Sequence, residues 1–161
     1  MAVTTQNSTE YGNTLAVPKV LNATNDAGGR LRIARFSFTQ SGAGDATSIA
    51  NLVKLPAGKV RVLLRNSWVV VSAFGASRTL DLGWAAHNSG ADGSAVAADA
   101  DGLDAAQDVS SALAYNPIGT IGGDETKLFD SAAGVLINAT VAGGTIPASA
   151  TINGYLIYIQ D

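Results

Sequence analysis

The chain has 161 residues, a formal net charge of −3 and no cysteine. That length suits one domain, and the lack of cysteine excludes a disulfide framework, a thiolate metal site and a cysteine nucleophile. Charged residues make up only 14% of the chain, against about a quarter in ordinary soluble domains, which is typical of a protein that buries surface against partners and also of a neutral, loop-rich β-domain.

Residues 1–30 show no clean hydrophobic periodicity. Apolar side chains are scattered there among Asn and Gly, namely Tyr11, Leu15, Val17, Val20 and Leu21. Such a segment buries too little apolar surface to fold alone, but it can order against another surface. We therefore divide the chain into an extended N-terminal arm, residues 1–30, and a β-sandwich domain, residues 31–161, and expect the five apolar arm residues to make contacts with a partner.

The first ten residues are polar and lack the basic and apolar segments of a secretory signal. No apolar run approaches the roughly 20 residues of a membrane-spanning helix. We expect a protein assembled in a cytoplasm, with no membrane partner.

The segment after the arm predicts two strands. Leu31 and Ile33 share one parity, whereas Phe36 and Phe38 share the other, so a β-bulge near Ala34-Arg35 would reconcile them. A second, short strand is predicted within residues 47–55.

Residues 59–86 predict a three-stranded β-meander. Val60, Val62 and Leu64 alternate with charged residues, as in a strand with one buried face. The run 68–74 is apolar at almost every position, which predicts a strand covered on both faces. A third run, residues 79–84, alternates again.

Residues 87–131 change character, with Gly, Ala and Asp dominating the first part. Leu103, Ala106, Val109 and Leu113 fall near helical spacing, and Asp101 is placed to cap the N-terminus of a helix. We predict one short helix there. A long segment without strands in a compact domain is usually functional or forms an interface.

The last third returns to strands. The final run, residues 151–160, carries apolar side chains on both parities, with Tyr155, Ile157 and Ile159 on one of them. Such a strand is either central in a sandwich or buried by another subunit, and we favour a subunit contact through these three residues. Repeated short strands with Gly-rich turns predict a mainly β fold, an antiparallel, jelly-roll-like β-sandwich.

The charges are unevenly distributed along the chain. Residues 1–80 hold nine of the ten basic side chains and three acids, whereas residues 81–161 hold one base and ten acids. A compact fold that mixes the two halves would cancel this asymmetry, and we favour that interpretation. Alternatively, opposite surfaces attract neighbouring copies, because complementary charge steers association.

Catalytic and metal-binding patterns are weak. His87 is the only imidazole and Ser89 lies close to it, but no serine has a nucleophile-elbow motif, so we do not expect an enzyme. Residues 99–108 resemble part of a calcium loop, yet alignment on Gly102 leaves Ala97 at the first ligand position and Asp108 at the last. A helix start with solvated carboxylates explains this stretch better, and we expect no cofactor.

Several arginines precede the acidic half of the chain, namely Arg30, Arg32, Arg35, Arg61 and Arg65. Aromatic residues interleaved for base stacking are missing from this set. We interpret these residues as a solvated sheet face and expect no nucleic-acid partner.

Four short motifs carry a family resemblance. They are Leu55-Pro56-Ala57-Gly58, Leu80-Asp81-Leu82-Gly83, Asp99-Ala100-Asp101-Gly102-Leu103 and Ala139-Thr140-Val141-Ala142-Gly143-Gly144, followed by a Tyr/Ile-rich terminal strand. Over residues 53–161 the chain resembles small virion structural proteins of tailed bacteriophages, and is most similar to capsid decoration and head-stabilising proteins. The resemblance implies a β-sandwich that stabilises a capsid, often as a trimer, with an arm tied to the shell or to a neighbour, and it assigns no functional residue.

Our leading functional hypothesis is therefore a non-enzymatic capsid decoration (cement) protein on the surface of the virion. Its partners would be the major capsid protein and other copies of itself. The alternative is a tail-fibre or carbohydrate-binding β-sandwich module. Trp68 and Trp84 are expected in the core, but Trp84 beside His87, Asn88 and Asp92 would form a sugar site if it were exposed.

Overall fold

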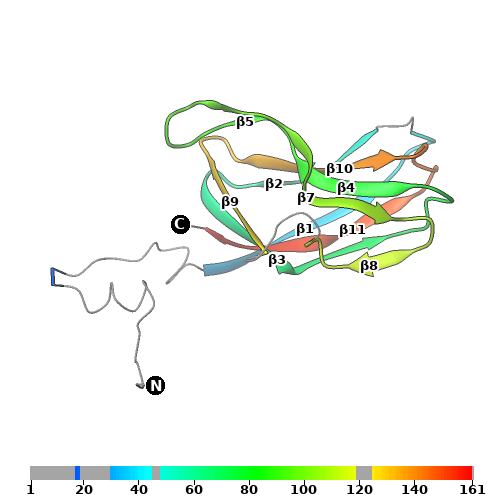
Figure 1. The fold of residues 1–161 in the computed structure, drawn as a ribbon, viewed down its shortest axis with the longest axis horizontal. Coiled ribbons are helices and arrows are strands. Elements are labelled where there is room, and N and C mark those ends of the chain that lie inside the picture. Colours follow the sequence, from blue (N-terminus) through cyan, green and yellow to red (C-terminus); the bar gives the residue numbers. More distant parts are fainter. Residues whose placement is uncertain (1–16, 19–29, 45–47, 119–124, 161) are drawn as a thin grey trace, which may run out of the picture.

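The computed structural model describes residues 17–18, 30–44, 48–118 and 125–160, which form eleven β-strands and no helix. Two antiparallel sheets lie face to face (Figure 1). The first sheet contains β1 (Arg30–Thr39), β11 (Thr151–Gln160), β3 (Gly58–Val71) and β8 (Leu113–Tyr115) in that order, with β9 (Thr126–Ser131) also paired to β3. The second sheet contains β2 (Ile49–Leu55), β10 (Val135–Ala142), β4 (Thr79–Trp84) and β7 (Asp99–Asp108), and β5 (His87–Asn88) and β6 (Ala95–Val96) form a separate hairpin.

The strand order identifies the sandwich as a jelly roll. Strands β1 to β4 fall alternately in the two sheets, β7 pairs beside β4 in the second sheet, and β1-β11-β3-β8 faces β2-β10-β4-β7. This is the double Greek-key arrangement of eight-stranded jelly rolls. The prediction of a mainly β, antiparallel, jelly-roll-like sandwich is confirmed.

The core lies between the sheets and follows the period-two alternation of the strands. Val60, Val62 and Leu64 of β3 point inward and are buried, as predicted for a strand with one buried face. Leu156 of β11 and Ile137 of β10 are also fully buried. Within the described residues, no helix is long and apolar enough to cross a membrane.

The bulge predicted near Ala34-Arg35 is wrong. β1 pairs with β11 in continuous register from Arg30↔Gln160 to Thr39↔Thr151. Phe36 is buried on the inner side, whereas Leu31 and Ile33 point outward and remain exposed. The change of parity therefore reflects a strand whose first half carries apolar side chains on its outer face.

The predicted β-meander is also wrong. The first two of its runs form one long strand, β3, and the third run, β4, belongs to the opposite sheet. The run after Ser67 is covered on one face only, since Val69 and Val71 are buried while Trp68 and Val70 are 37% and 39% exposed.

A wide bulge explains how β3 stays in one sheet over its 14 residues. Tyr155 pairs with Trp68 and Ile157 pairs with Leu63, so residues 64–67 of β3 lie opposite a single residue of β11. Ser67 is completely buried there. Its hydroxyl donates to the Leu63 carbonyl (2.8 Å) and accepts from the Ile157 amide (3.0 Å), which replaces the lost ladder hydrogen bond.

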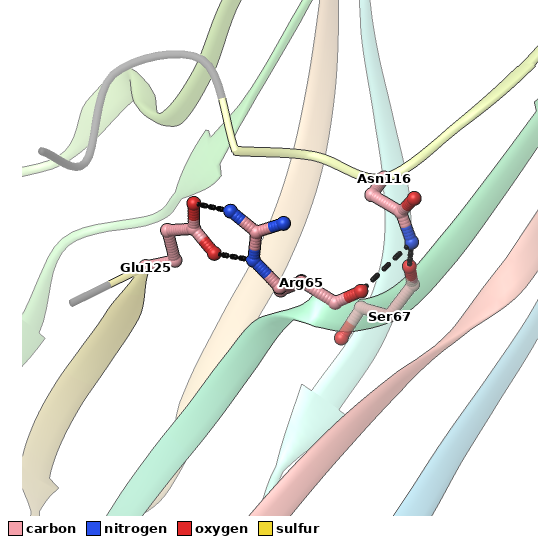
Figure 2. Close-up of polar contacts among 4 residues, drawn as sticks. All are labelled: Arg65, Ser67, Asn116 and Glu125. Atoms are coloured by element: carbon pink, nitrogen blue, oxygen red, sulfur yellow. Dashed lines mark hydrogen bonds and ion pairs between the residues drawn. The ribbon is translucent and has the colours of Figure 1, made fainter. Parts of the chain in front are cut away.

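Two side chains from distant parts of the chain, Asn116 after β8 and Glu125 before β9, hold this bulge (Figure 2). The Asn116 amide nitrogen donates to the Arg65 carbonyl (3.0 Å) and to the Ser67 carbonyl (2.6 Å). The Arg65 guanidinium also makes a two-pronged ion pair with Glu125, just before β9. Carbonyl groups that point away from the ladder are thus satisfied by partners distant in sequence.

The short helix predicted around residues 103–113 is absent, and the stretch 99–108 is strand β7. Leu82 pairs with Asp104 and Trp84 pairs with Asp99 along β4, with register shifts between the pairs. Leu103 is fully buried by this pairing. Because long-range pairing buries more apolar surface than an isolated short helix, it overrides the local helical spacing, and Asp101 lies within strand β7 rather than at the start of a helix.

The bulge yields a stability prediction. Ser67→Ala removes the hydroxyl and leaves the Ile157 amide buried without its partner, so unfolding should require about 1–3 kcal/mol less free energy. Chemical denaturation measures this difference. The exposed Ser111→Ala is the matched control and should change stability by less than about 0.5 kcal/mol; equal effects of the two substitutions would show that Ser67 does not support the bulge.

Candidate interaction surface

Apolar side chains form two adjacent rows across the outer face of the first sheet. The cross-strand register places Leu31 beside Ile159, and Ile33 beside Ile157. It continues from Ile157 to Leu63 of β3, and from Ile159 across Arg61 to Leu128 of β9. We name this set the outer patch: Leu31, Ile33, Leu63, Leu128, Ile157 and Ile159.

The outer patch is open to solvent. Leu31 is 66% exposed, Ile33 is 56% exposed and Leu128 is 45% exposed. The described part of the chain contains seven exposed large apolar side chains, and five of them lie on this one face, because Trp68 and Val70 point outward in the neighbouring rows of β3. Clustered exposure of this kind is typical of an interaction site.

The residues predicted for subunit contact lie on this face. Tyr155, Ile157 and Ile159 all point outward from β11 and are partly exposed, while Leu156 and Tyr158 between them point into the core. The apolar side chains on both faces of β11 therefore have two explanations: one face is buried in the core, and the other is an outward apolar face. Whether a second subunit covers that face remains a prediction.

Sequence reasoning missed four of the six residues of the outer patch. Leu31 and Ile33 gave a signal, the change of parity within β1, but we explained it by a bulge. Leu63 and Leu128 gave none, since their places in the patch depend on the pairing of β3 with β11 and with β9.

Of the predicted arm contacts, only Val17 lies within the described residues, and it is 96% exposed. Tyr11, Leu15, Val20 and Leu21 lie outside the described residues.

Folding keeps the charges of the two sheets apart. The strands of the first sheet hold seven basic and one acidic side chain, and the strands of the second sheet hold one basic and five acidic side chains. The mixing that we favoured from the sequence does not occur between the sheets. All five arginines of the predicted set belong to the first sheet, where Arg35 and Arg65 are exposed on the outer face.

A small cavity of about 240 Å³ lies between the β5–β6 hairpin and β9. Its lining includes Trp84, His87, Ser89, Lys127 and Phe129. Ser89 accepts a hydrogen bond from the Ala91 amide, and His87 Nδ1 lies 3.2 Å from the Ala85 carbonyl. The serine hydroxyl and the imidazole are not hydrogen-bonded to each other, so they do not form a nucleophile–base pair.

Trp84 cannot offer its ring to a sugar. It is only 6% exposed, and Lys127 Nζ lies 4.2 Å from its ring centroid in a cation–π contact. Phe129 packs edge-on against it with ring centroids 5.3 Å apart. The expectation that Trp84 lies in the core is confirmed, whereas the same expectation for Trp68 is wrong.

The acidic stretch of β7 is extended rather than looped. Burial and the neighbouring Asp101 carboxylate raise the pKa of Asp99 above its usual range. Among the described residues, no group of three or more His, Asp or Glu side chains gathers to hold a metal ion. The calcium-loop geometry, and the solvated helix start that we preferred to it, are both replaced by strand pairing with β4.

Comparison with known proteins gives a likeness in structure only. No protein-family model matches the chain, and no curated protein sequence matches it. A chain in the capsid of Ralstonia phage GP4 is 22% identical, with a TM-score of 0.58, over 88% of this chain and 91% of that one. A chain in the capsid asymmetric unit of cyanophage Pam1 is 15% identical, with a TM-score of 0.51, over 91% of this chain and 96% of that one. The fold is thus shared with proteins found in phage capsids, as the sequence resemblance implied.

The two tryptophans should respond differently to a solvent quencher. In Trp68→Phe the remaining Trp84 should emit at short wavelength and be weakly quenched by acrylamide, because its ring is covered. In Trp84→Phe, the remaining Trp68 should be quenched more strongly in dilute solution. Strong acrylamide quenching of Trp84, or quenching of it by added sugars, would contradict the covered environment and favour a carbohydrate-binding module.

Proposed function

We propose that the chain is a bacteriophage virion structural protein that decorates the capsid and stabilises it, as a cement protein. The observation that carries this proposal is the fold, a jelly-roll sandwich shared over nearly the full length of both chains with proteins in two phage capsid structures. The apolar outer face of this chain supports the proposal as a surface for contacts. Jelly rolls recur in viral capsid domains and also in lectin domains.

The proposed mechanism is mass action. Many copies that bind only the assembled shell lower its free energy relative to the opened state by RT ln(1 + c/Kd) for each site, where c is the concentration of free protein. The partner is the major capsid protein, and the protein acts as a homo-oligomer, which we propose to be a trimer, on the outer surface of a virion assembled in the host cytoplasm. No covalent chemistry is needed for this role, and we assign no catalytic residue.

Two groups of residues carry the proposed contacts. Tyr155, Ile157 and Ile159, on the exposed side of β11, contact a neighbouring copy. The apolar arm residues Tyr11, Leu15, Val17, Val20 and Leu21 tie the protein to the shell or to a neighbour. The Trp84 sugar site considered for the tail-fibre or carbohydrate-binding alternative is closed, since the Trp84 ring is covered.

Removal of residues 1–25 should abolish binding to shells while the sandwich remains folded, since β1 begins at Arg30. Loss of multivalent attachment is expected to weaken binding by about 100-fold or more. Co-sedimentation with expanded shells that lack the protein measures binding, and thermal unfolding checks the fold.

The matched comparison keeps the arm at full length. Replacing the five apolar arm residues by Ser should reproduce the loss, whereas replacing the polar Thr4, Thr5, Gln6, Ser8 and Thr9 by Ala should not. Full-length protein that never sediments with shells would refute the decoration function, and undiminished binding by the truncated protein would refute the role of the arm.

A further inference from the structure

The outer patch lacks a cover from its own fold. Its two rows lie side by side on β1, β11, β3 and β9, and the second sheet packs on the opposite side of these strands. Leu31 and Ile33 are more than half exposed. Leaving a continuous apolar row in water costs free energy, so the row is expected to be covered in the working state.

A second copy is poorly suited to cover this patch with its own identical patch. Arg35 points outward in the row next to Ile33, and Arg61 lies within the row of Leu31 and Ile159. A two-fold contact is self-complementary, so it would bring these arginines near those of the partner. Like charges placed together oppose such a contact.

The chain itself supplies an apolar segment of the right length. The 29 residues before β1 include five large apolar side chains between positions 11 and 21, and residues 10–21 carry one acid, Glu10, and one base, Lys19, a net charge of zero. From Leu21 to Arg30 an extended chain can reach about 30 Å, several times the roughly 4.8 Å between neighbouring strands. An apolar segment without net charge brings no like-charge repulsion to an apolar patch that is flanked by arginines.

The described part of the arm is not covered by its own copy. Val17 is 96% exposed and so makes almost no contact with the sandwich to which it belongs. The exposed Val17 side chain of the arm and the exposed apolar face on the same chain can cover each other when copies assemble. Because each copy then gives one arm and receives one, the contact is heterologous and can close into a ring.

We propose that residues 10–21 of one copy lie across the outer patch of a second copy, so that exchanged arms join the copies. This inference deepens the proposed function and rests on it for its setting, an oligomer that decorates a shell. Loss of shell binding on arm removal then follows from loss of the oligomer and of its multivalent attachment.

The absence of cysteine makes the proposal directly testable by disulfide trapping. A tagged Leu15→Cys protein is mixed with an untagged Ile33→Cys protein and oxidised, and mixed dimers are measured by mass. Ile49→Cys is the matched control, because Ile49 is also an exposed isoleucine (60%) but lies on β2 of the second sheet. We expect roughly tenfold more mixed dimer with Ile33→Cys than with Ile49→Cys, reflecting a raised effective concentration.

The double variant Leu15→Cys/Ile33→Cys distinguishes the copy that provides the arm. Exchanged arms should give disulfide-linked oligomers, whereas an arm folded on its own sandwich would give a cross-linked monomer and overturn the proposal. Equal yields for the Ile33 and Ile49 variants would overturn it as well.

A charge placed in the patch provides a second measurement without cysteine. Ile33→Asp should lower the fraction of oligomer in light scattering by roughly tenfold, because a carboxylate would be buried under the arm. Ile49→Asp should leave that fraction unchanged. The melting temperatures of both variants should equal that of the unmodified protein, which would confirm that both are folded.

These experiments need no shell, so they separate the two proposals. Trapped oligomers from a protein that never binds shells would leave arm exchange standing and refute decoration. Shell binding without trapping would leave decoration standing and refute arm exchange.

Discussion

A two-layer sandwich can bury only one face of each sheet, and this constraint governs the rest of the structure. In β11, alternate side chains such as Leu156 and Tyr158 fill the core, while Ile157 and Ile159 must point away from it. The same division in β1 leaves Leu31 and Ile33 outside. Apolar side chains that the core cannot receive therefore collect on one outer face, where only another segment or molecule can cover them.

The polar groups of the first sheet keep that face continuous. The bulge in β3 shifts residues 64–67 out of the ladder, and the buried Ser67 hydroxyl restores a hydrogen bond to β11. Asn116 and the Arg65–Glu125 ion pair hold the displaced backbone from a distant part of the chain. With the bulge so fixed, Leu63 stays in register with Ile157, and the row of apolar side chains is not interrupted.

Local periodicity predicted the fold class and part of the surface, but it failed where pairing partners decide. In a sandwich, the alternation of Val60, Val62 and Leu64 indicates a strand with one buried face. Apolar side chains on both faces of the last strand indicate one face in the core and one apolar face outside it. By contrast, the helical spacing after Gly102 is overridden by the pairing of β7 with β4. The backbone of β7 at Asp99 and Ala100 lies so close to Gly83 of β4 that a side chain at Gly83 would not fit. Leu128 joins the outer patch only through the register of β9, which no local pattern contains.

The central claim is that this protein works through contacts that cover its outer patch. Its most direct test is the rate at which a maleimide labels Ile33→Cys in the protein bound to assembled particles, compared with Ile49→Cys in the same particles. We predict labelling at position 33 that is several-fold slower than at position 49, although both isoleucines are more than half exposed in the single chain. Equal or faster labelling at position 33 would show that the patch stays open to water and would contradict the claim.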